Sequence, residues 1–188
     1  SLQARHDVVL LNMFESILAY YYALLQEAEK IPDVFRLHRL DTVNYFAPGK
    51  PMMELIENQV YLSQGAYAKV LGRSEGLLTL CEGMHYALVA LHIRIQSAAA
   101  YEMLGKTEKA HALLSRALSD AAPDGFAMPF VENYGFLKPL LARERKTDLI
   151  AKITELGEGA GARNAASARP AVFDALTPRE FEIVELMA

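Results

Sequence analysis

The sequence is poor in the residues on which several classes of protein depend. It has one cysteine and no tryptophan in 188 residues. A single cysteine excludes a disulfide framework and a zinc module built on several thiolates. The 19 lysines and arginines are outnumbered by 23 aspartates and glutamates, so the net charge is −4. This balance argues against binding of nucleic acid by charge alone, because phosphate contacts need clustered basic side chains.

Long apolar runs are missing as well. The most apolar stretch, 8–25, is interrupted by Asn12 and Glu15, whereas a membrane-spanning helix needs about 20 mostly apolar residues. No signal-peptide pattern opens the chain. We expect a cytoplasmic location, which the lone thiol supports weakly. We also expect no membrane partner. Because the chain starts with Ser1 and stops within an apolar run, we expect it to be a piece of a longer protein.

What the sequence does contain is helical periodicity. Apolar residues recur at steps of three and four, and no segment alternates as a half-buried strand does. The first predicted helix ends near Ile31 and Pro32, because a residue before proline avoids the helical conformation. The further predicted helices are 33–46, 52–64, 66–80, 83–104 and 107–121, with shorter ones at 129–133, 136–142 and 147–156. Residues 157–169 have no large apolar side chain and are predicted to be flexible.

One segment of the chain repeats. Residues 61–70 can be laid over residues 101–110, an offset of 40, so that Tyr61 matches Tyr101 and Gly65 matches Gly105. Paired helices repeating every 34 to 47 residues indicate an α-solenoid, and the second copy also fits the tetratricopeptide pattern. We therefore predict an all-α fold, an α-α superhelix of tetratricopeptide-like repeats. A generic helical bundle with a chance similarity is the alternative.

The segment 176–188, with the sequence LTPREFEIVELMA, has a well-specified helix start. Thr177 is a suitable N-cap, Pro178 suits the first helical position, and Glu180 can close a capping box. The string resembles the first helix of the LuxR-type helix-turn-helix, which opens with Leu-Thr-Pro-Arg-Glu. Phe181 and Met187 depart mildly from that pattern. The turn, scaffold helix and recognition helix of this family do not follow within the chain.

A second stretch carries a related resemblance. Residues 124–126 (Asp-Gly-Phe), 130–132 (Phe-Val-Glu) and 140–141 (Leu-Leu) are similar to the repeat region that precedes the DNA-binding domain in large MalT-like regulators, with 133–135 departing slightly. The resemblance implies a helical-repeat sensor domain over 1–156, a flexible linker over 157–175 and a truncated helix-turn-helix over 176–188. It also implies an upstream nucleotide-binding domain. The phosphate-binding string of such domains does not occur here, so we expect no cofactor in this fragment.

No constellation for catalysis stands out, and we predict that the chain is not an enzyme. Cys81, His85 and His92 have a spacing that could share one helix face, but a buried thiol and ordinary histidines explain them better than zinc, and we predict no metal site. Glu54 and Glu57 are interpreted as a solvated face rather than an acid pair. Tyr20 to Tyr22 are interpreted as packing residues, and the basic cluster Lys138, Arg143, Arg145 and Lys146 as facing acidic neighbours.

The predicted ligand site lies in the groove of the superhelix. The first helix of each tetratricopeptide pair lines the concave side, and a mixed polar and apolar lining suits a small molecule or a peptide. By register, one unit exposes His92, Gln96, Ala99 and either Glu102 or Met103 to the groove. The other unit exposes Gln59, Leu62 and Ser63, and Arg94 is nearby.

The function expected from these features is that of a sensor. A small inducer or a regulatory protein would bind the helical repeats and bias a switch that controls a C-terminal DNA-binding domain. DNA would be contacted only through the part of the full-length protein missing here, and a homo-oligomer is possible. The alternative is a tetratricopeptide-like scaffold that docks proteins and has no role on DNA. The residues that follow Ala188 would discriminate between the two.

Overall fold

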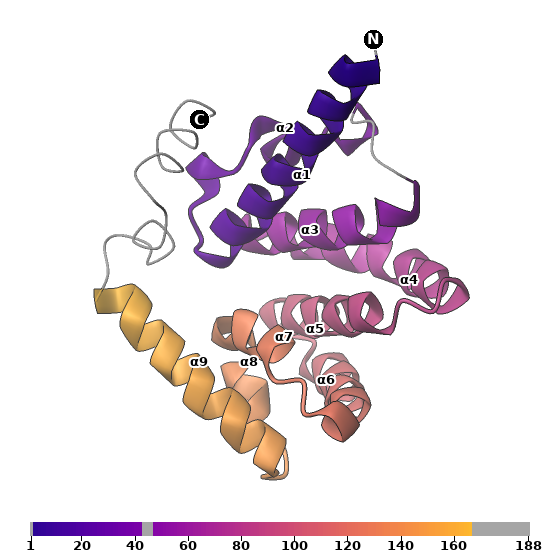
Figure 1. Cartoon of the computed structure of the whole chain (residues 1–188). Helices are drawn as coiled ribbons and strands as arrows, with labels where there is room; N and C mark the ends of the chain where they lie inside the picture. Colours follow the sequence, from indigo (N-terminus) through magenta and orange to yellow (C-terminus); the bar gives the residue numbers. More distant parts are fainter. Residues whose placement is uncertain (1, 43–46, 167–188) are drawn as a thin grey trace.

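The computed structural model describes residues 2–42 and 47–166, and every regular element in this part of the chain is helical (Figure 1). The fold is therefore all-α, as predicted. The α-helices are α1 (Leu2–Leu24), α2 (Asp33–Arg36), α3 (Lys50–Ser63), α4 (Tyr67–Gly83), α5 (Ala87–Met103), α6 (Thr107–Ala121), α7 (Met128–Glu132), α8 (Tyr134–Leu141) and α9 (Asp148–Ala166). Short 3-10 helices are η1 (Ala28–Lys30), η2 (Leu40–Thr42), η3 (Ala47–Gly49) and η4 (Ala122–Asp124).

Turns of three residues join α3 to α4, α4 to α5 and α5 to α6. At the first of these, the amide of Gly65 donates to the Leu62 carbonyl at 3.1 Å and the amide of Ala66 donates to the Tyr61 carbonyl at 2.8 Å. This is the Schellman pattern, which needs a residue of positive φ just after the helix. The same turn recurs at intervals of 20 residues, each time with one residue in the left-handed conformation, which we call the left-handed joint. These residues are Gly65, His85, Gly105 and Gly125, with φ of 71°, 56°, 69° and 64°.

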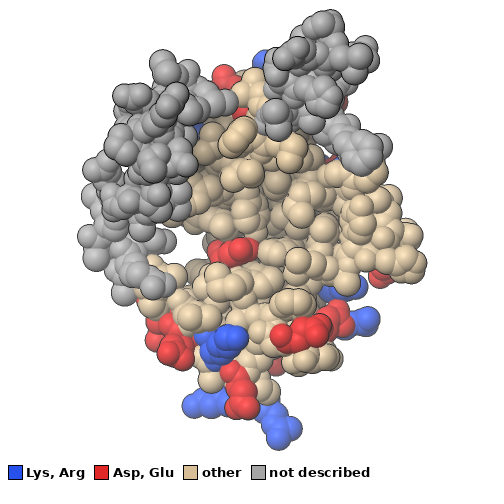
Figure 2. Space-filling model, in the orientation of Figure 1, with Lys and Arg blue, Asp and Glu red and all other residues tan. Residues whose placement is uncertain are grey.

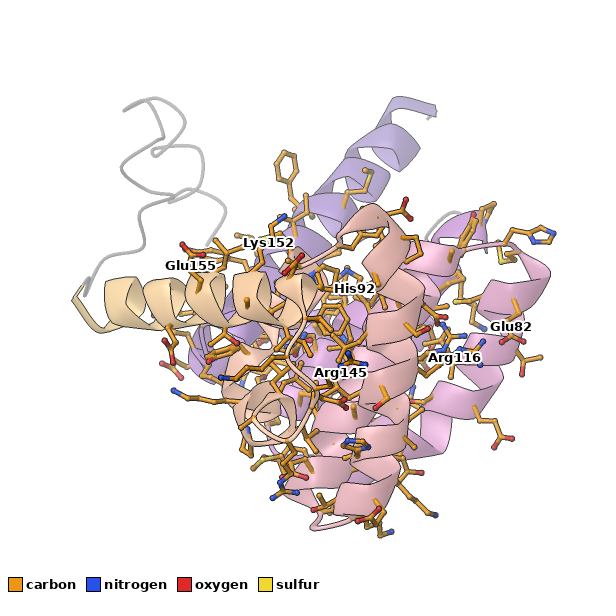
Figure 3. The ribbon with its side chains drawn as sticks, turned by 90° about the horizontal axis from the view of Figure 1, so that it is seen from below. Glu82, His92, Arg116, Arg145, Lys152 and Glu155 are labelled. Atoms are coloured by element: carbon orange, nitrogen blue, oxygen red, sulfur yellow. The ribbon has the colours of Figure 1, made fainter. Side chains whose placement is uncertain are left out.

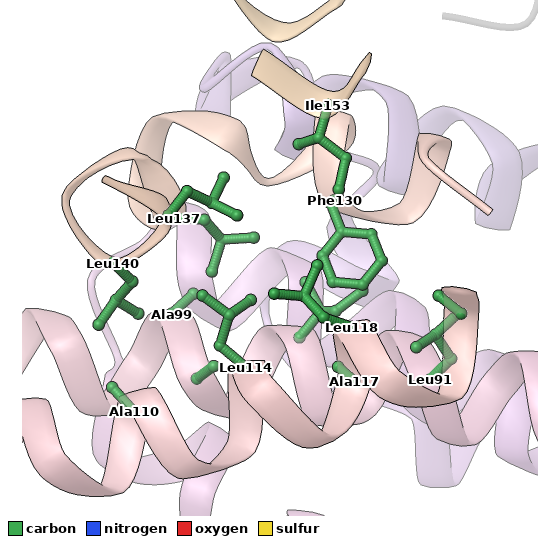
Figure 4. Close-up of a cluster of buried hydrophobic side chains, with 14 of the residues drawn as sticks. Leu91, Ala99, Ala110, Leu114, Ala117, Leu118, Phe130, Leu137, Leu140 and Ile153 are labelled. Carbon is green, nitrogen blue, oxygen red and sulfur yellow. The ribbon is translucent and has the colours of Figure 1, made fainter. Parts of the chain in front are cut away.

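The larger hydrophobic core lies between α5, α6 and the short helices that follow (Figure 4). Small residues on α5 and α6 let the two backbones approach, and larger side chains from α7, α8 and α9 fill the remaining space. Ile153 of α9 points toward Phe130 of α7 in Figure 4, and both are fully buried. The small residues at this contact are Ala98, Ala99, Ala100, Ala110, Ala117 and Ala121.

A second core joins α1, α2, α3 and α4 to the other side of α5. Helix α1 buries the small side chains Ser16, Ala19 and Ala23, and it packs on α3. Larger apolar side chains of α1, such as Phe14 and Ile17, remain more than half exposed. Because α5 contributes to both cores, it fixes the position of the N-terminal helices relative to α7, α8 and α9.

Several predicted helix boundaries are wrong. The helix predicted over 33–46 stops at Arg36, because His38 adopts φ of 55° and closes a Schellman turn there. The helix predicted to start at 83 starts at Ala87, since Gly83 is the last residue of α4 and His85 forms the joint. The helix predicted over 107–121 agrees with α6 at both ends.

The predicted linker does not begin at residue 157. Helix α9 continues from Asp148 to Ala166, so 157–166 are helical rather than a flexible extension of the 1–156 domain. Gly157 belongs to the packed part of this helix and lies against Tyr134 of α8. The remainder of the predicted linker, 167–175, and the predicted helix-turn-helix start, 176–188, lie outside the described residues.

Candidate functional site

Three side chains from the separate helices α1, α5 and α7 meet in the structure. The Tyr20 hydroxyl of α1 donates a 2.7 Å hydrogen bond to Glu132 Oε2 at the end of α7. His92 Nδ1 of α5 lies 3.5 Å from the Tyr20 hydroxyl and 3.7 Å from Glu132 Oε2. Figure 3 shows His92 at the centre of the molecule. We call these three residues the Tyr20–His92–Glu132 cluster.

Partial burial controls the charges of this cluster. Burial lowers the pKa of His92 to about 4, so the ring is neutral at pH 7. Burial, followed by the charge and the hydrogen bond of Glu132, raises the pKa of Tyr20 far above its ordinary value and keeps its hydroxyl a donor. Burial also raises the pKa of Glu132, and the hydrogen bond from Tyr20 opposes that shift. The cluster therefore presents a desolvated carboxyl group beside a neutral imidazole.

The surface around the cluster carries little positive charge. Among the described residues, no lysine or arginine pairs with Glu132, whose 3.7 Å contact is with the neutral ring of His92. On the face that Figure 2 shows, acidic side-chain atoms lie in the middle with uncharged atoms around them, while most of the basic side chains lie toward the lower edge. The exposed fractions of the His92 and Glu132 side chains are 15% and 26%, so both remain accessible to a ligand.

A chain of buried amides lies beside the cluster. Gln96 Nε2 of α5 donates to Gln59 Oε1 of α3 at 2.9 Å and to the Leu55 carbonyl at 3.1 Å. Gln59 Nε2 in turn donates to Asn133 Oδ1 at 3.0 Å. Since Gln96 follows His92 by one helical turn and Asn133 follows Glu132 directly, the amide chain connects the elements that position the cluster.

The six predicted groove residues do not form one surface. Gln59, Leu62 and Gln96 are at most 1% exposed, which corrects the expectation that they line an open groove. Leu62 packs in the larger hydrophobic core, and the two glutamines are held by the amide chain. His92 is the one member placed in the Tyr20–His92–Glu132 cluster.

Arg94 and Glu102 lie elsewhere. Arg94 points to the opposite side of α5 from His92 and pairs with Asp120 at 3.2 Å and with Glu82 at 3.7 Å. Glu102 is half-buried near the end of α5, and its Oε2 atom has no hydrogen-bond partner among the described residues. Arg94 was expected near the groove, but it is two positions from His92, and a shift of two positions along a helix turns a side chain by about 200°.

The sequence analysis missed Tyr20, Glu132 and Asn133 as site residues. Tyr20 was interpreted as packing, and Glu132 and Asn133 entered only through the family resemblance. Tyr20 and Glu132 are 112 positions apart, so no single-helix pattern could have joined them. The signal that was available is the polar character of Glu132 and Asn133 next to the apolar residues Phe130 and Val131.

A second polar cluster ties α2 to α3 and α4. Arg73 of α4 pairs with Glu54 and Glu57 of α3, and Glu57 is only 4% exposed, which corrects the interpretation of these glutamates as a solvated face. The His38 ring stacks on Tyr61 with 3.8 Å between centroids, and Arg73 lies near the same tyrosine ring. Because each charge has a partner within the fold, this cluster fixes the α2 segment in place.

The part of the chain that the structure describes lacks two further features, a cluster of metal ligands and a membrane span. No group of three or more histidine, cysteine or carboxylate side chains suited to a metal ion occurs there. Cys81 is buried at 1% exposure, and His85 occupies the turn after α4. None of the helices described is both long and apolar enough to cross a bilayer.

The chain was also compared with known proteins. No family model, no curated protein and no solved structure matches it.

Proposed function

We propose that this chain is the sensor domain of a MalT-like transcriptional regulator of the LuxR family. In this proposal a small effector or a regulatory protein binds the helical repeats, and binding controls a C-terminal DNA-binding domain in a cytoplasmic protein. The chain itself catalyses no reaction. The resemblance of 176–188 to a helix-turn-helix start supports the DNA role, and the paired helices with equivalent joints at Gly65 and Gly105 support tetratricopeptide-like repeats.

The observation that carries the sensor role is the convergence of α1, α5 and α7 at the Tyr20–His92–Glu132 cluster. The three helices come from the start, the middle and the later part of the chain. A ligand that contacts all three side chains would therefore favour one relative position of the three helices. A ligand shifts a conformational equilibrium only through such a difference in affinity between two states. The neutral imidazole, the phenol and the carboxyl group offer hydrogen bonds of both polarities to a small polar molecule.

The DNA role is tested by determining the amino acids encoded directly after Ala188. A continuation with a scaffold helix and a basic recognition helix would support the proposal. A stop codon or a further helical repeat at that position would overturn it and favour the alternative, a tetratricopeptide-like scaffold that only docks proteins.

The sensor role is tested by differential scanning fluorimetry of the chain with a panel of amino acids, sugars, nucleotides and short peptides. A ligand that binds only the native state raises the melting temperature by an amount that grows with the ratio of its concentration to its Kd. We expect at least one panel member to do so in the wild type and to lose its effect in Glu132→Gln and Tyr20→Phe. A hit that stabilises both variants as well as the wild type would place binding elsewhere.

A further inference from the structure

Helices α4 and α6 both pack on α5 and leave a groove between them. Because each is antiparallel to α5, the two walls of the groove run in the same direction. Two hollows occupy it, one of about 550 Å³ and one of about 410 Å³. The larger lies at the ends of α4 and α6, and the smaller lies nearer their starts. Ala90 and Arg94 of α5 form part of the floor of the first hollow, and Ser97 and Tyr101 part of that of the second.

The groove has the length and lining of a helix-binding surface. From Ala90 to Tyr101 the floor extends for roughly 16 Å, which is about three helical turns. Leu71 and Leu78 of α4 and Leu113 of α6 contribute apolar surface to the smaller hollow, and Leu88 and Leu91 do so in the larger one. An amphipathic helix binds such a groove through apolar residues on successive turns of one face.

The α4 wall carries two acidic residues and the α6 wall carries two basic residues, and the spacing is the same on both walls. On α4, Glu75 and Glu82 are seven residues apart, and on α6, Lys109 and Arg116 are also seven apart. A separation of seven places both residues of a pair on one helix face, two turns from each other. All four are exposed. Figure 3 shows Glu82 and Arg116 on the same side of the molecule, away from His92.

The remaining charges of the groove are partly satisfied within the fold. Arg94 on the floor is 15% exposed and pairs with Asp120 at 3.2 Å. Asp120 also accepts from Arg116 Nε at 3.2 Å, and Glu82 reaches Arg94 at 3.7 Å. Asp124 and His85 lie at the end of the larger hollow. Glu75 has no ion-pair partner among the described residues, and Lys109 lies over the Tyr101 ring. The acidic α4 wall and the basic start of the α6 wall are thus open to a partner.

We propose that the groove between α4 and α6 docks an amphipathic α-helix of a partner protein. The apolar face of that helix packs on the leucines of the groove. One flank carries basic residues toward Glu75 and Glu82, and the other carries acidic residues toward Lys109 and Arg116. The surface is distinct from the Tyr20–His92–Glu132 cluster, because Arg94 and His92 project from opposite sides of α5. The inference therefore does not depend on the proposed sensor function.

The test uses three fluorescein-labelled helical peptides of the same length and the same leucine face. One has a lysine flank and a glutamate flank, one has lysine on both flanks, and one has glutamate on both. Fluorescence anisotropy measures their binding to the chain, and circular dichroism verifies that the peptides are helical. We expect the mixed peptide to bind at least about tenfold more tightly than either single-charge peptide, because like charges across a docking surface weaken association.

Reversing the charges of one wall is then expected to change which of the three peptides the chain binds most tightly. The variant Glu75→Lys/Glu82→Lys makes both walls basic and is expected to prefer the peptide with two glutamate flanks. The variant Lys109→Glu/Arg116→Glu is expected to prefer the peptide with two lysine flanks. The control is Lys152→Glu/Glu155→Lys on α9, which reverses two exposed charges of opposite sign outside the groove, leaves the net charge unchanged and is expected to behave as the wild type.

Three results would overturn the proposal. The first is that the mixed peptide does not bind the wild-type chain at millimolar concentration. The second is that the wall variants keep the wild-type order of preference. The third is that backbone amide NMR shifts on peptide addition map to α1 and α7 and spare α4 and α6.

Discussion

Gly157 of α9 lies directly against the ring of Tyr134 of α8. A Cβ atom placed on this glycine would come within 2.3 Å of Tyr134 Cγ and within 2.7 Å of both Cδ atoms. No real Cβ makes such a contact, so the two helices pack at this distance only because residue 157 has no side chain. The neighbouring glycines of the same helix, Gly159 and Gly161, have open space at the corresponding position.

Gly157→Ala is therefore expected to destabilise the fold by about 1–3 kcal/mol, the usual cost of overpacking. Urea denaturation followed by circular dichroism measures the change. Gly159→Ala is the matched control and is expected to be neutral or stabilising by up to about 1 kcal/mol, because alanine favours a helix. Truncation of the ring in Gly157→Ala/Tyr134→Ala should make the alanine at 157 harmless. If alanine at 157 costs the same with and without that ring, the contact does not explain the glycine.

His85→Gly is expected to stabilise the protein by about 0.5–1 kcal/mol. His85 is the one member of the 20-residue series of joints that is not glycine, and its φ of 56° is unfavourable for a residue with a Cβ. The side chain is exposed, so its removal loses little packing. The midpoint of urea unfolding measures the effect, and Gly105→Ala at the equivalent joint should lower stability. A loss of stability in His85→Gly would mean that the imidazole makes a favourable interaction that outweighs backbone strain.

Asn58→Leu is expected to stabilise the fold by about 1–2 kcal/mol. Asn58 is fully buried in α3, and neither its Oδ1 nor its Nδ2 atom has a hydrogen-bond partner among the described residues. Replacing an unsatisfied buried amide by an apolar side chain of similar size removes a desolvation cost. The adjacent Gln59→Leu is the contrast, because it removes the hydrogen bonds that Gln59 makes with Gln96 Nε2 and with Asn133 Oδ1, and it should destabilise the fold. Thermal unfolding of both variants tests the pair, and the same sign of change in both would refute this argument.

The stability of the protein is expected to fall as the pH is lowered from about 6.5 toward 4. The folded-state pKa of His92 is about 4, below the ordinary value of 6.5. Between these values the unfolded chain binds a proton that the folded chain excludes, so acidification favours unfolding. The contribution of His92 between pH 7 and pH 5 is roughly 2 kcal/mol from the linkage relation. Urea denaturation at several pH values should show a smaller loss in His92→Gln than in the wild type.

Glu132 acts in the opposite direction in the same experiment. Its pKa is raised in the folded state, so its contribution is present at low pH and is lost as the pH rises through the folded-state value. Glu132→Gln is therefore expected to steepen the loss of stability on acidification. Equal pH profiles in the wild type and in both variants would contradict the proposed charge states of the cluster.

The sequence predicted the helical class because its apolar residues follow one period throughout. It placed α6 correctly because the helix lies between Gly105 and the Pro123-Asp124-Gly125 stop. It failed at His85, where a histidine takes the backbone conformation that glycine usually marks, so α5 was predicted to start at 83 rather than at Ala87. It failed again after Leu156, where glycine and alanine suggested flexibility. At Gly157, the small residue instead permits contact with Tyr134.

The candidate site was predictable only in part. Helical register predicted Gln59, His92 and Gln96 in one groove. In the structure Gln59 and Gln96 are hydrogen-bonded to each other and buried, and His92 lies one turn before Gln96 on α5. It could not distinguish the buried amides from the accessible imidazole, because burial depends on which other helices cover a face. Tyr20 and Glu132 come from elements far along the chain in either direction. Their contact with His92 depends on how α1 and α7 pack on α3 and α5.

The left-handed joints at Gly65 and Gly105 have a consequence for extending the protein. The 40 residues from Ala66 to Gly105 begin just after one joint and end on another of nearly the same conformation, with φ of 71° and 69°. A second copy of this segment inserted after Gly105 would meet the chain at a matching backbone geometry on both sides. It would add a complete α4–α5 hairpin between the existing hairpin and α6. The joints are therefore the positions at which we expect the protein to accept an added helical hairpin with its existing turns unchanged.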